Sequence, residues 1–258
     1  IDFNRNILKL DGKEYELRDS FLPTVDPADP YKLTTEEQEI MEKLHHSFVS
    51  SEKLKQHMNC LFRYGCMYTI SNSNLLFHAS VPLNADGTLK DVIIAGKPYK
   101  GKQLLEKVGH LTRTAFFTEE ETEEKKFARD YVWYLWCGKD SPVFDKNKMA
   151  TFERYFLKEK ELHKETKGYY YTLREDEKIC DMLLDEFGVE GKHRHIINGH
   201  VPVKTIKGEN PIKNTKMMLI DGGFSKAYHS QTGIAGYTLV YHSRGFQLIQ
   251  HEPFTSMQ

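Results

Sequence analysis

Apolar residues recur along the chain with two different periods, which predict a mixture of helices and strands. Through the central part of the chain they return every three or four residues, and this spacing predicts helices. A capping box of Thr35 and Gln38 would begin the first helix, and Gly65 would end the second. The helical segments expected are 35–48, 54–62, 101–117, 119–135, 151–163 and 175–187.

Shorter apolar or alternating runs predict strands near both ends of the sequence. Residues 2–10 and 15–17 read as the arms of a hairpin around Asp11-Gly12, a pair that suits a tight turn. The interleaving of both element types predicts an α/β fold (α+β mixed) in one continuous body. The remaining strands expected are 74–77, 196–197, 217–220, 237–241 and 246–249.

Composition narrows the range of partners. With 258 residues, of which 39% are hydrophobic, the chain can bury a substantial core as one large or two small domains. Its 36 basic and 37 acidic residues give a net charge of -1, which favours a small-molecule partner over nucleic acid or an anionic membrane. No apolar run reaches the roughly 20 residues that span a bilayer, so we expect a cytoplasmic protein. The four cysteines form no CxxC pair, which predicts buried thiols.

Two histidines follow apolar strands, and each is a candidate metal ligand. His78 comes directly after residues 74–77 and precedes small residues, whereas His200 follows Ile196-Ile197-Asn198-Gly199 and precedes a turn with proline. A strand end fixes the backbone while small neighbours leave room for an ion and a substrate. A hydrogen-bonded structural histidine is the alternative at either position.

Two further segments could line a site. In Asp221-Gly222-Gly223-Phe224-Ser225-Lys226-Ala227-Tyr228, glycines accompany a lysine and a tyrosine, a composition that suits contact with phosphate oxygens. A hairpin loop with a solvated lysine is the alternative. The aromatic residues of the segment 133–142 are typical of core packing, with the Gly-Lys-Asp-Ser-Pro turn near a site as the alternative.

Together these segments resemble the class III fructose-1,6-bisphosphatases of bacteria, a branch of the calcineurin-like metallophosphoesterases. The likeness is strongest in 196–204 and 221–237, and Phe224-Ser225 with Tyr228 is similar to the Phe-Ser-aromatic loop of the protein phosphatases. Other matching segments are His57-Met58-Asn59, Tyr134-Leu135-Trp136, Thr151-Phe152-Glu153-Arg154-Tyr155-Phe156 and Leu173-Arg174-Glu175-Asp176-Glu177.

The resemblance implies a sandwich of β-sheets flanked by helices and a site with two divalent ions, expected to be manganese, whose bridging hydroxide attacks phosphorus. His78 and His200 would be neutral ligands of one ion, so metal affinity should fall below about pH 6.5. A sugar bisphosphate, the small-molecule substrate, also needs an anion pocket away from the metals. Candidates for that pocket are Lys226, Tyr228, Arg154 and Lys164.

The family's Asp-x-His, Gly-Asp-x-x-Asp and Gly-Asn-His-Asp/Glu segments do not occur in this sequence. We therefore expect 1–258 to be the C-terminal portion of a metallophosphoesterase domain, with a helical insertion around 101–190 and little activity alone. The bridging aspartate and the acid histidine would lie upstream, so we assign no catalytic residue here. The alternatives are a protein phosphatase of the same superfamily and a noncatalytic interaction module. A homo-oligomer is compatible with the sequence.

Overall fold

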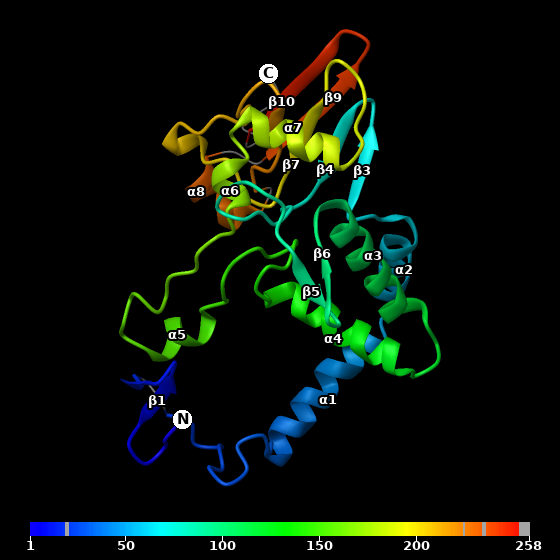
Figure 1. The fold of residues 1–258 in the computed structure, drawn as a ribbon. Coiled ribbons are helices and arrows are strands. Elements are labelled where there is room, and N and C mark those ends of the chain that lie inside the picture. Colours follow the sequence, from blue (N-terminus) through cyan, green and yellow to red (C-terminus); the bar gives the residue numbers. More distant parts are fainter. Residues whose placement is uncertain (19–20, 224, 234–235, 253–258) are drawn as a thin grey trace, which may run out of the picture. The chain divides into compact units, whose positions relative to one another are not determined.

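A computed structural model describes residues 1–18, 21–223, 225–233 and 236–252. These residues form two compact units. The first consists of Ile1–Gly65 and Lys148–Thr166, and the second of Cys66–Asn147 and Lys167–Gln258. Helices and strands occur in both units, which confirms the mixed α/β class predicted from the sequence (Figure 1).

The first unit begins with the predicted hairpin. Strands β1 (Ile7–Leu10) and β2 (Lys13–Glu16) pair antiparallel, and the turn between them places Asp11 and Gly12 at positive φ. Residue Arg18 then joins the hairpin to α5 (Thr151–Phe156), because its guanidinium donates to the carbonyl oxygens of Arg154 and Tyr155. Helix α5 ends well before the predicted boundary at 163, since 158–161 alternate charged residues and offer no apolar face.

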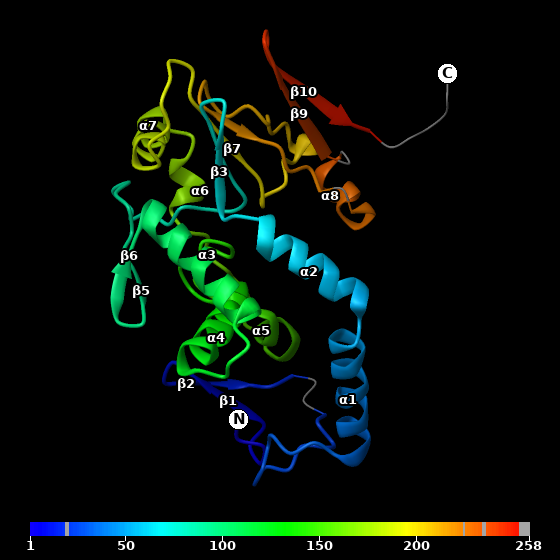
Figure 2. The same cartoon turned by 90° about the vertical axis from the view of Figure 1, so that its right-hand side faces the viewer.

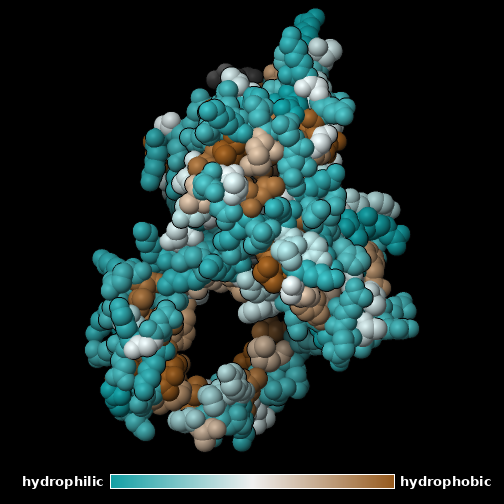
Figure 3. Space-filling model, viewed as in Figure 1, coloured by the Kyte–Doolittle hydropathy of each residue, from teal (hydrophilic) through white to brown (hydrophobic). Residues whose placement is uncertain are grey.

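Helices α1 (Thr35–Val49) and α2 (Glu52–Tyr64) complete the first unit. The capping box of α1 consists of Thr34 and Glu37, one position earlier than predicted. The Thr34 hydroxyl accepts a hydrogen bond from the Glu37 N–H, and the Glu37 carboxylate accepts one from the Thr34 N–H. No residue of either helix is buried, and most of their large apolar side chains are exposed, among them Ile40, Phe48 and Leu61. In Figure 3 hydrophobic surface is coloured brown.

A four-stranded sheet is the centre of the second unit. Its order is β3 (Tyr68–Ser71), β4 (Asn74–Phe77), β7 (His195–Asn198) and β8 (Met217–Leu219). Strand β4 runs antiparallel to β3 and parallel to β7, which in turn runs parallel to β8. Because parallel neighbours end at the same edge of a sheet, the residues that follow β4 and β7 meet there.

One face of this sheet packs against helices. Leu75, Ile196 and Met217 are fully buried in a core with Leu183 and Leu184 of α7 (Glu177–Glu186). Figure 2 shows α7 on one side of the sheet and the hairpin of β9 (Gly236–His242) and β10 (Gly245–His251) toward the other. The sheet is therefore layered between a helix and a hairpin.

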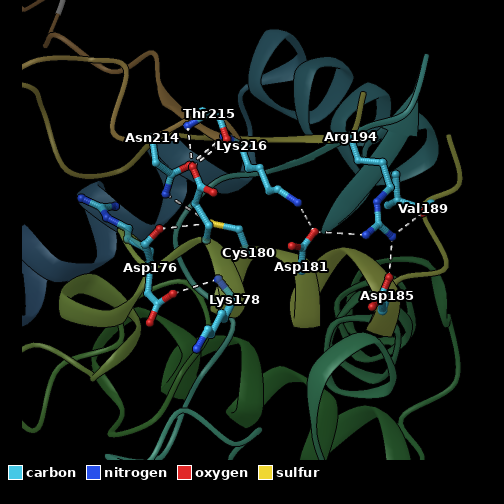
Figure 4. Close-up of polar contacts among 12 residues, drawn as sticks. Asp176, Lys178, Cys180, Asp181, Asp185, Val189, Arg194, Asn214, Thr215 and Lys216 are labelled. Atoms are coloured by element: carbon cyan, nitrogen blue, oxygen red, sulfur yellow. Dashed lines mark hydrogen bonds and ion pairs between the residues drawn. The ribbon is translucent and has the colours of Figure 1, made fainter. Parts of the chain in front are cut away.

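Ion pairs fix α7 to the sheet edge. The carboxylate of Asp181 accepts from Arg194, at 3.1 Å, and from Lys216, which precedes β8 (Figure 4). Arg194 also pairs with Asp185, so two cations and two carboxylates alternate along this side. Next to them, the buried Cys180 thiol donates to the Arg174 carbonyl.

A second core lies between α3 (Gly101–Phe117) and α4 (Glu123–Cys137), where Leu104, Val108 and Leu111 pack with Tyr131 and Leu135. The remaining elements of the second unit are β5 (Val92–Ile94), β6 (Lys97–Tyr99), α6 (Tyr170–Leu173), η1 (Thr205–Lys207), η2 (Lys226–Tyr228) and α8 (His229–Thr232).

Two predictions about burial are wrong. Trp133 and Trp136 are 65% and 63% exposed, because only the Tyr131 and Leu135 side of α4 faces the core. Of the cysteines, Cys180 is buried, whereas Cys60 and Cys66 are exposed, since α2 buries nothing and the turn after it lies open. Among the described residues no helix is long and apolar enough to cross a bilayer.

Candidate functional site

The parallel pairing of β4 and β7 brings His78 and His200 together although they are 122 positions apart in sequence. Phe77 and Asn198 are paired in the sheet register, and the two histidines follow them at the same edge. The Nε2 of His78 lies 3.3 Å from the Nδ1 of His200, with ring centroids 5.1 Å apart. The geometry therefore meets the condition that two ligands of one ion must satisfy.

This spacing has two chemical interpretations. Nitrogens bound at about 2.0–2.1 Å to one cation lie roughly 3 to 3.4 Å apart at ordinary coordination angles. Two neutral imidazoles can also form a hydrogen bond over the same distance. No group of three or more potential metal-binding side chains occurs within the described ranges, so these residues supply at most part of a ligand set. Metal binding by His78 and His200 stays a prediction.

The backbone at His200 is strained. The N–H of Val201 donates to the carbonyl of Gly199 at 2.8 Å, and His200 between them has a φ of 66°. This is a γ-turn with a positive central φ, a rare conformation that costs about 1–3 kcal/mol. A non-glycine residue held in this way is typical of sites where the side-chain direction matters more than stability.

Asn198 fixes the edge on which both histidines stand. Its side chain is 1% exposed. The amide oxygen accepts from the Tyr170 hydroxyl at 3.1 Å and from the Arg174 guanidinium at 3.0 Å. The amide nitrogen lies within 2.9–3.2 Å of three successive carbonyl oxygens, those of Phe77, His78 and Ala79. Asn198 thus locks the backbone that carries His78 to the strand that carries His200.

The surroundings of His200 favour its neutral form. Burial is the largest cause that lowers the pKa of His200, followed by the neighbouring His78 and by Lys146. Asp221 acts in the opposite direction and raises the pKa. A neutral imidazole is the form that can bind a metal ion.

A pocket of about 530 Å³ opens beside His78 on the sheet face away from α7. His78, Asn198 and Asp221 are among its polar lining residues, and Leu76 and Ile197 are among its apolar ones. Asp221 follows β8, and its carboxylate accepts from the Gly223 N–H at 3.0 Å. The third strand of the parallel set therefore contributes a carboxylate near the two imidazoles.

The four predicted phosphate-binding residues are distributed over both units. Lys226 and Tyr228 belong to the second unit, where both side chains are exposed on η2. Arg154 belongs to the first unit and already pairs with Glu165 at 3.1 Å, and Lys164 lies exposed in the same unit. Phe224, part of the loop that resembles the protein phosphatases, lies outside the described residues. The substrate-binding assignments stay predictions.

The sequence prediction missed a set of cations around Tyr171. The Nζ of Lys167 lies 5.4 Å and the guanidinium carbon of Arg174 lies 5.2 Å from the centre of the Tyr171 ring, which is 6.4 Å from the ring of His200. Lys146 pairs across an isolated bridge with Lys167. The motif 173–177 contains Arg174, but nothing in the sequence shows that this arginine is buried.

Comparison with known proteins confirms the resemblance found in the sequence. The family model described as Firmicute fructose-1,6-bisphosphatase matches residues 1–258. The class 3 fructose-1,6-bisphosphatase of Phocaeicola vulgatus is 82% identical over 260 residues, and those of Bacteroides fragilis and Clostridium acetobutylicum are 68% and 54% identical over 259 residues. Each match covers 100% of this chain but only 39% of the relative's length. No solved structure matches.

Proposed function

Because the chain belongs to the Firmicute fructose-1,6-bisphosphatase family over residues 1–258, we propose that it contributes part of the site that hydrolyses fructose 1,6-bisphosphate to fructose 6-phosphate and phosphate. This is a reaction of gluconeogenesis. The observation that supports the proposal most is the 3.3 Å separation of the two imidazoles at one sheet edge. The partner would be a small sugar bisphosphate.

The donors present fit part of a divalent-metal site. His78 and His200 would hold one cation, and manganese is our assignment because it accepts imidazole together with carboxylate and water ligands. When bound, divalent cations would lower the pKa of water and offset negative charge on the phosphoryl oxygens. The residues of this chain hold two imidazoles at a fixed spacing, through the Asn198 hydrogen bonds and the γ-turn at His200.

We further propose that the sheet forms one half of a calcineurin-like sandwich, of which 1–258 is the C-terminal portion with a helical insertion around 101–190. The residues between β4 and β7 include α3, α4 and α7, which supports the insertion. The apolar side chains of Leu76, Ile197 and Ile220 line an open pocket on the sheet face away from α7. The β9–β10 hairpin lines a second pocket with the same three side chains, and a second sheet supplied by the longer polypeptide would cover what the hairpin leaves open.

The test uses a full-length form, meaning this chain within a polypeptide of its relatives' length. The unmodified protein should release phosphate from fructose 1,6-bisphosphate and not from a phosphopeptide. His200→Ala should abolish the release while circular dichroism shows an unchanged fold. Hydrolysis of the phosphopeptide alone would favour a protein phosphatase. Full activity of His200→Ala would overturn the role of this edge and favour a noncatalytic module.

A further inference from the structure

A buried arginine beside the histidines has no carboxylate partner. Arg174 is 5% exposed, and it forms no ion pair with any acidic residue in the part of the chain that the structure describes. Its Nη1 donates to the Asn198 side chain, a neutral acceptor, whereas its buried Nε has no hydrogen-bond partner there. A buried charge costs several kcal/mol unless an opposite charge and hydrogen bonds compensate it, so this guanidinium calls for an anion.

A second cation lies on the same aromatic ring. Lys167 and Arg174 both approach Tyr171, at 5.4 and 5.2 Å from the ring centre, and the buried Tyr171 hydroxyl also has no hydrogen-bond partner among the described residues. Two cations therefore approach one aromatic ring, and the charges that act on its hydroxyl are the Asp145 carboxylate first and the Arg174 guanidinium second. Cations and a hydroxyl donor are the groups that hold a phosphate, which accepts directional hydrogen bonds and attracts positive charge.

The charges around Lys167 also favour a bound anion. Burial lowers the pKa of Lys167, and the positive charges of Arg174, Lys204 and Lys146 lower it further. Among the causes of this shift, only Glu209 acts the other way, and its effect is the smallest. Positive charges therefore outnumber negative ones among the groups that act on the Lys167 ammonium, and a bound dianion would offset them.

We propose that Arg174, Lys167 and the Tyr171 hydroxyl form a subsite for the phosphate group of the substrate that is not hydrolysed. The Tyr171 ring is 6.4 Å from the His200 ring, so one small substrate can reach both the subsite and the imidazoles. The assignment rests on the proposed function, since it presumes a substrate with two phosphates. It assigns the second phosphate to residues other than Lys226 and Tyr228.

A purely structural role for Arg174 is the competing explanation, because its bond to Asn198 supports the histidine edge. Lys167 separates the two explanations. It has no contact with Asn198, and its exposed position makes substitution compatible with folding. Lys192 is the matched control, since it is an exposed lysine of the same unit that precedes β7 and so lies at the opposite end of the strand from His200.

The experiment compares fructose 1,6-bisphosphate with fructose 1-phosphate, which keeps the same scissile phosphate and lacks the second one. In the full-length form, Lys167→Ala should lower the ratio of kcat/KM for the bisphosphate over the monophosphate about ten-fold or more. Lys167→Arg should restore the ratio, and Lys192→Ala should leave it unchanged. An unchanged ratio in Lys167→Ala would overturn the subsite.

Binding of inorganic phosphate separates this proposal from the proposed function. Titration calorimetry on the metal-free full-length form should show phosphate binding that weakens about ten-fold in Lys167→Ala and not in Lys192→Ala. If neither sugar phosphate is hydrolysed, the proposed function fails, yet this result would still support an anion pocket. Equal phosphate binding by the unmodified protein and Lys167→Ala, or none in either, would overturn the pocket.

Discussion

Replacement of Asn198 by alanine tests how the histidine edge is held together. The substitution leaves the buried Tyr170 hydroxyl and one Arg174 N–H without their acceptor, and it removes the donor shared by three carbonyls. Each lost hydrogen bond costs about 1 kcal/mol, and each buried group left unsatisfied costs about 1–3 kcal/mol. We therefore expect Asn198→Ala to lower the free energy of unfolding by about 3–5 kcal/mol, a large part of the roughly 5–15 kcal/mol that stabilises a domain.

Asn74 offers a matched control at the opposite end of the same sheet. It is 3% exposed and its side chain donates to the carbonyls of Ser71 and Asn72, so Asn74→Ala should also destabilise, by about 1–3 kcal/mol. Only Asn198→Ala should also weaken manganese binding by the full-length form, by about 10–100-fold, as loss of a residue that orients metal ligands does.

Urea unfolding followed by circular dichroism measures the stability of both variants, and equilibrium dialysis measures their manganese affinity. A loss below about 1 kcal/mol in Asn198→Ala would show that the five contacts are weaker than their geometry indicates. Unchanged manganese affinity would refute the role of Asn198 in positioning His78. Equal effects of both variants on manganese would point to a general loss of fold.

Three further outcomes follow from the local structure. His200→Gly should keep or raise the free energy of unfolding in urea, by up to about 2 kcal/mol, because glycine relieves the positive φ; a loss above about 1 kcal/mol would contradict the strain. A thiol reagent should modify Cys60 and Cys66 quickly and Cys180 only after unfolding, and fast labelling of Cys180 would show that its core opens. Ion pairs lower the pKa of Asp181, so their stabilisation is present above pH of about 4 and is lost as pH falls through the lowered value. Asp181→Asn should lower the free energy of unfolding in urea at pH 7 by less than about 1 kcal/mol, and by less as the pH falls below about 4; an effect that does not change with pH would refute the ion pairs.

The sequence predicted the parts of the fold that depend on local periodicity. The strand 74–77 and the helix 101–117 lie where the apolar spacing placed them, because each has enough apolar residues on one face to be recognised alone. Strand β3 was missed, since three of its four residues are exposed and its place depends on pairing with β4. The length of the helix predicted at 151–163 was overestimated, because the charged residues 158–161 offer no apolar face that could pack against a core.

Part of the candidate site could likewise be predicted from local sequence, and part depends on the tertiary structure. Each histidine could be found from the strand before it, but their 3.3 Å separation depends on a parallel pairing between strands more than a hundred residues apart. The family resemblance supplied that link where local patterns could not. The role of Arg174 could not be predicted from the sequence, because its burial and its hydrogen bond to Asn198 arise only in the tertiary structure.

Manganese stoichiometry in the full-length form tests the shared-cation assignment most directly. The metal should be counted by mass spectrometry after equilibrium dialysis, for the unmodified protein and for the double variant His78→Ala and His200→Ala, with circular dichroism as the check on folding. If the two imidazoles share one ion, the unmodified protein binds two equivalents and the folded double variant loses one of them. Two equivalents retained at unchanged affinity would show that the 3.3 Å pair is a hydrogen bond between neutral rings.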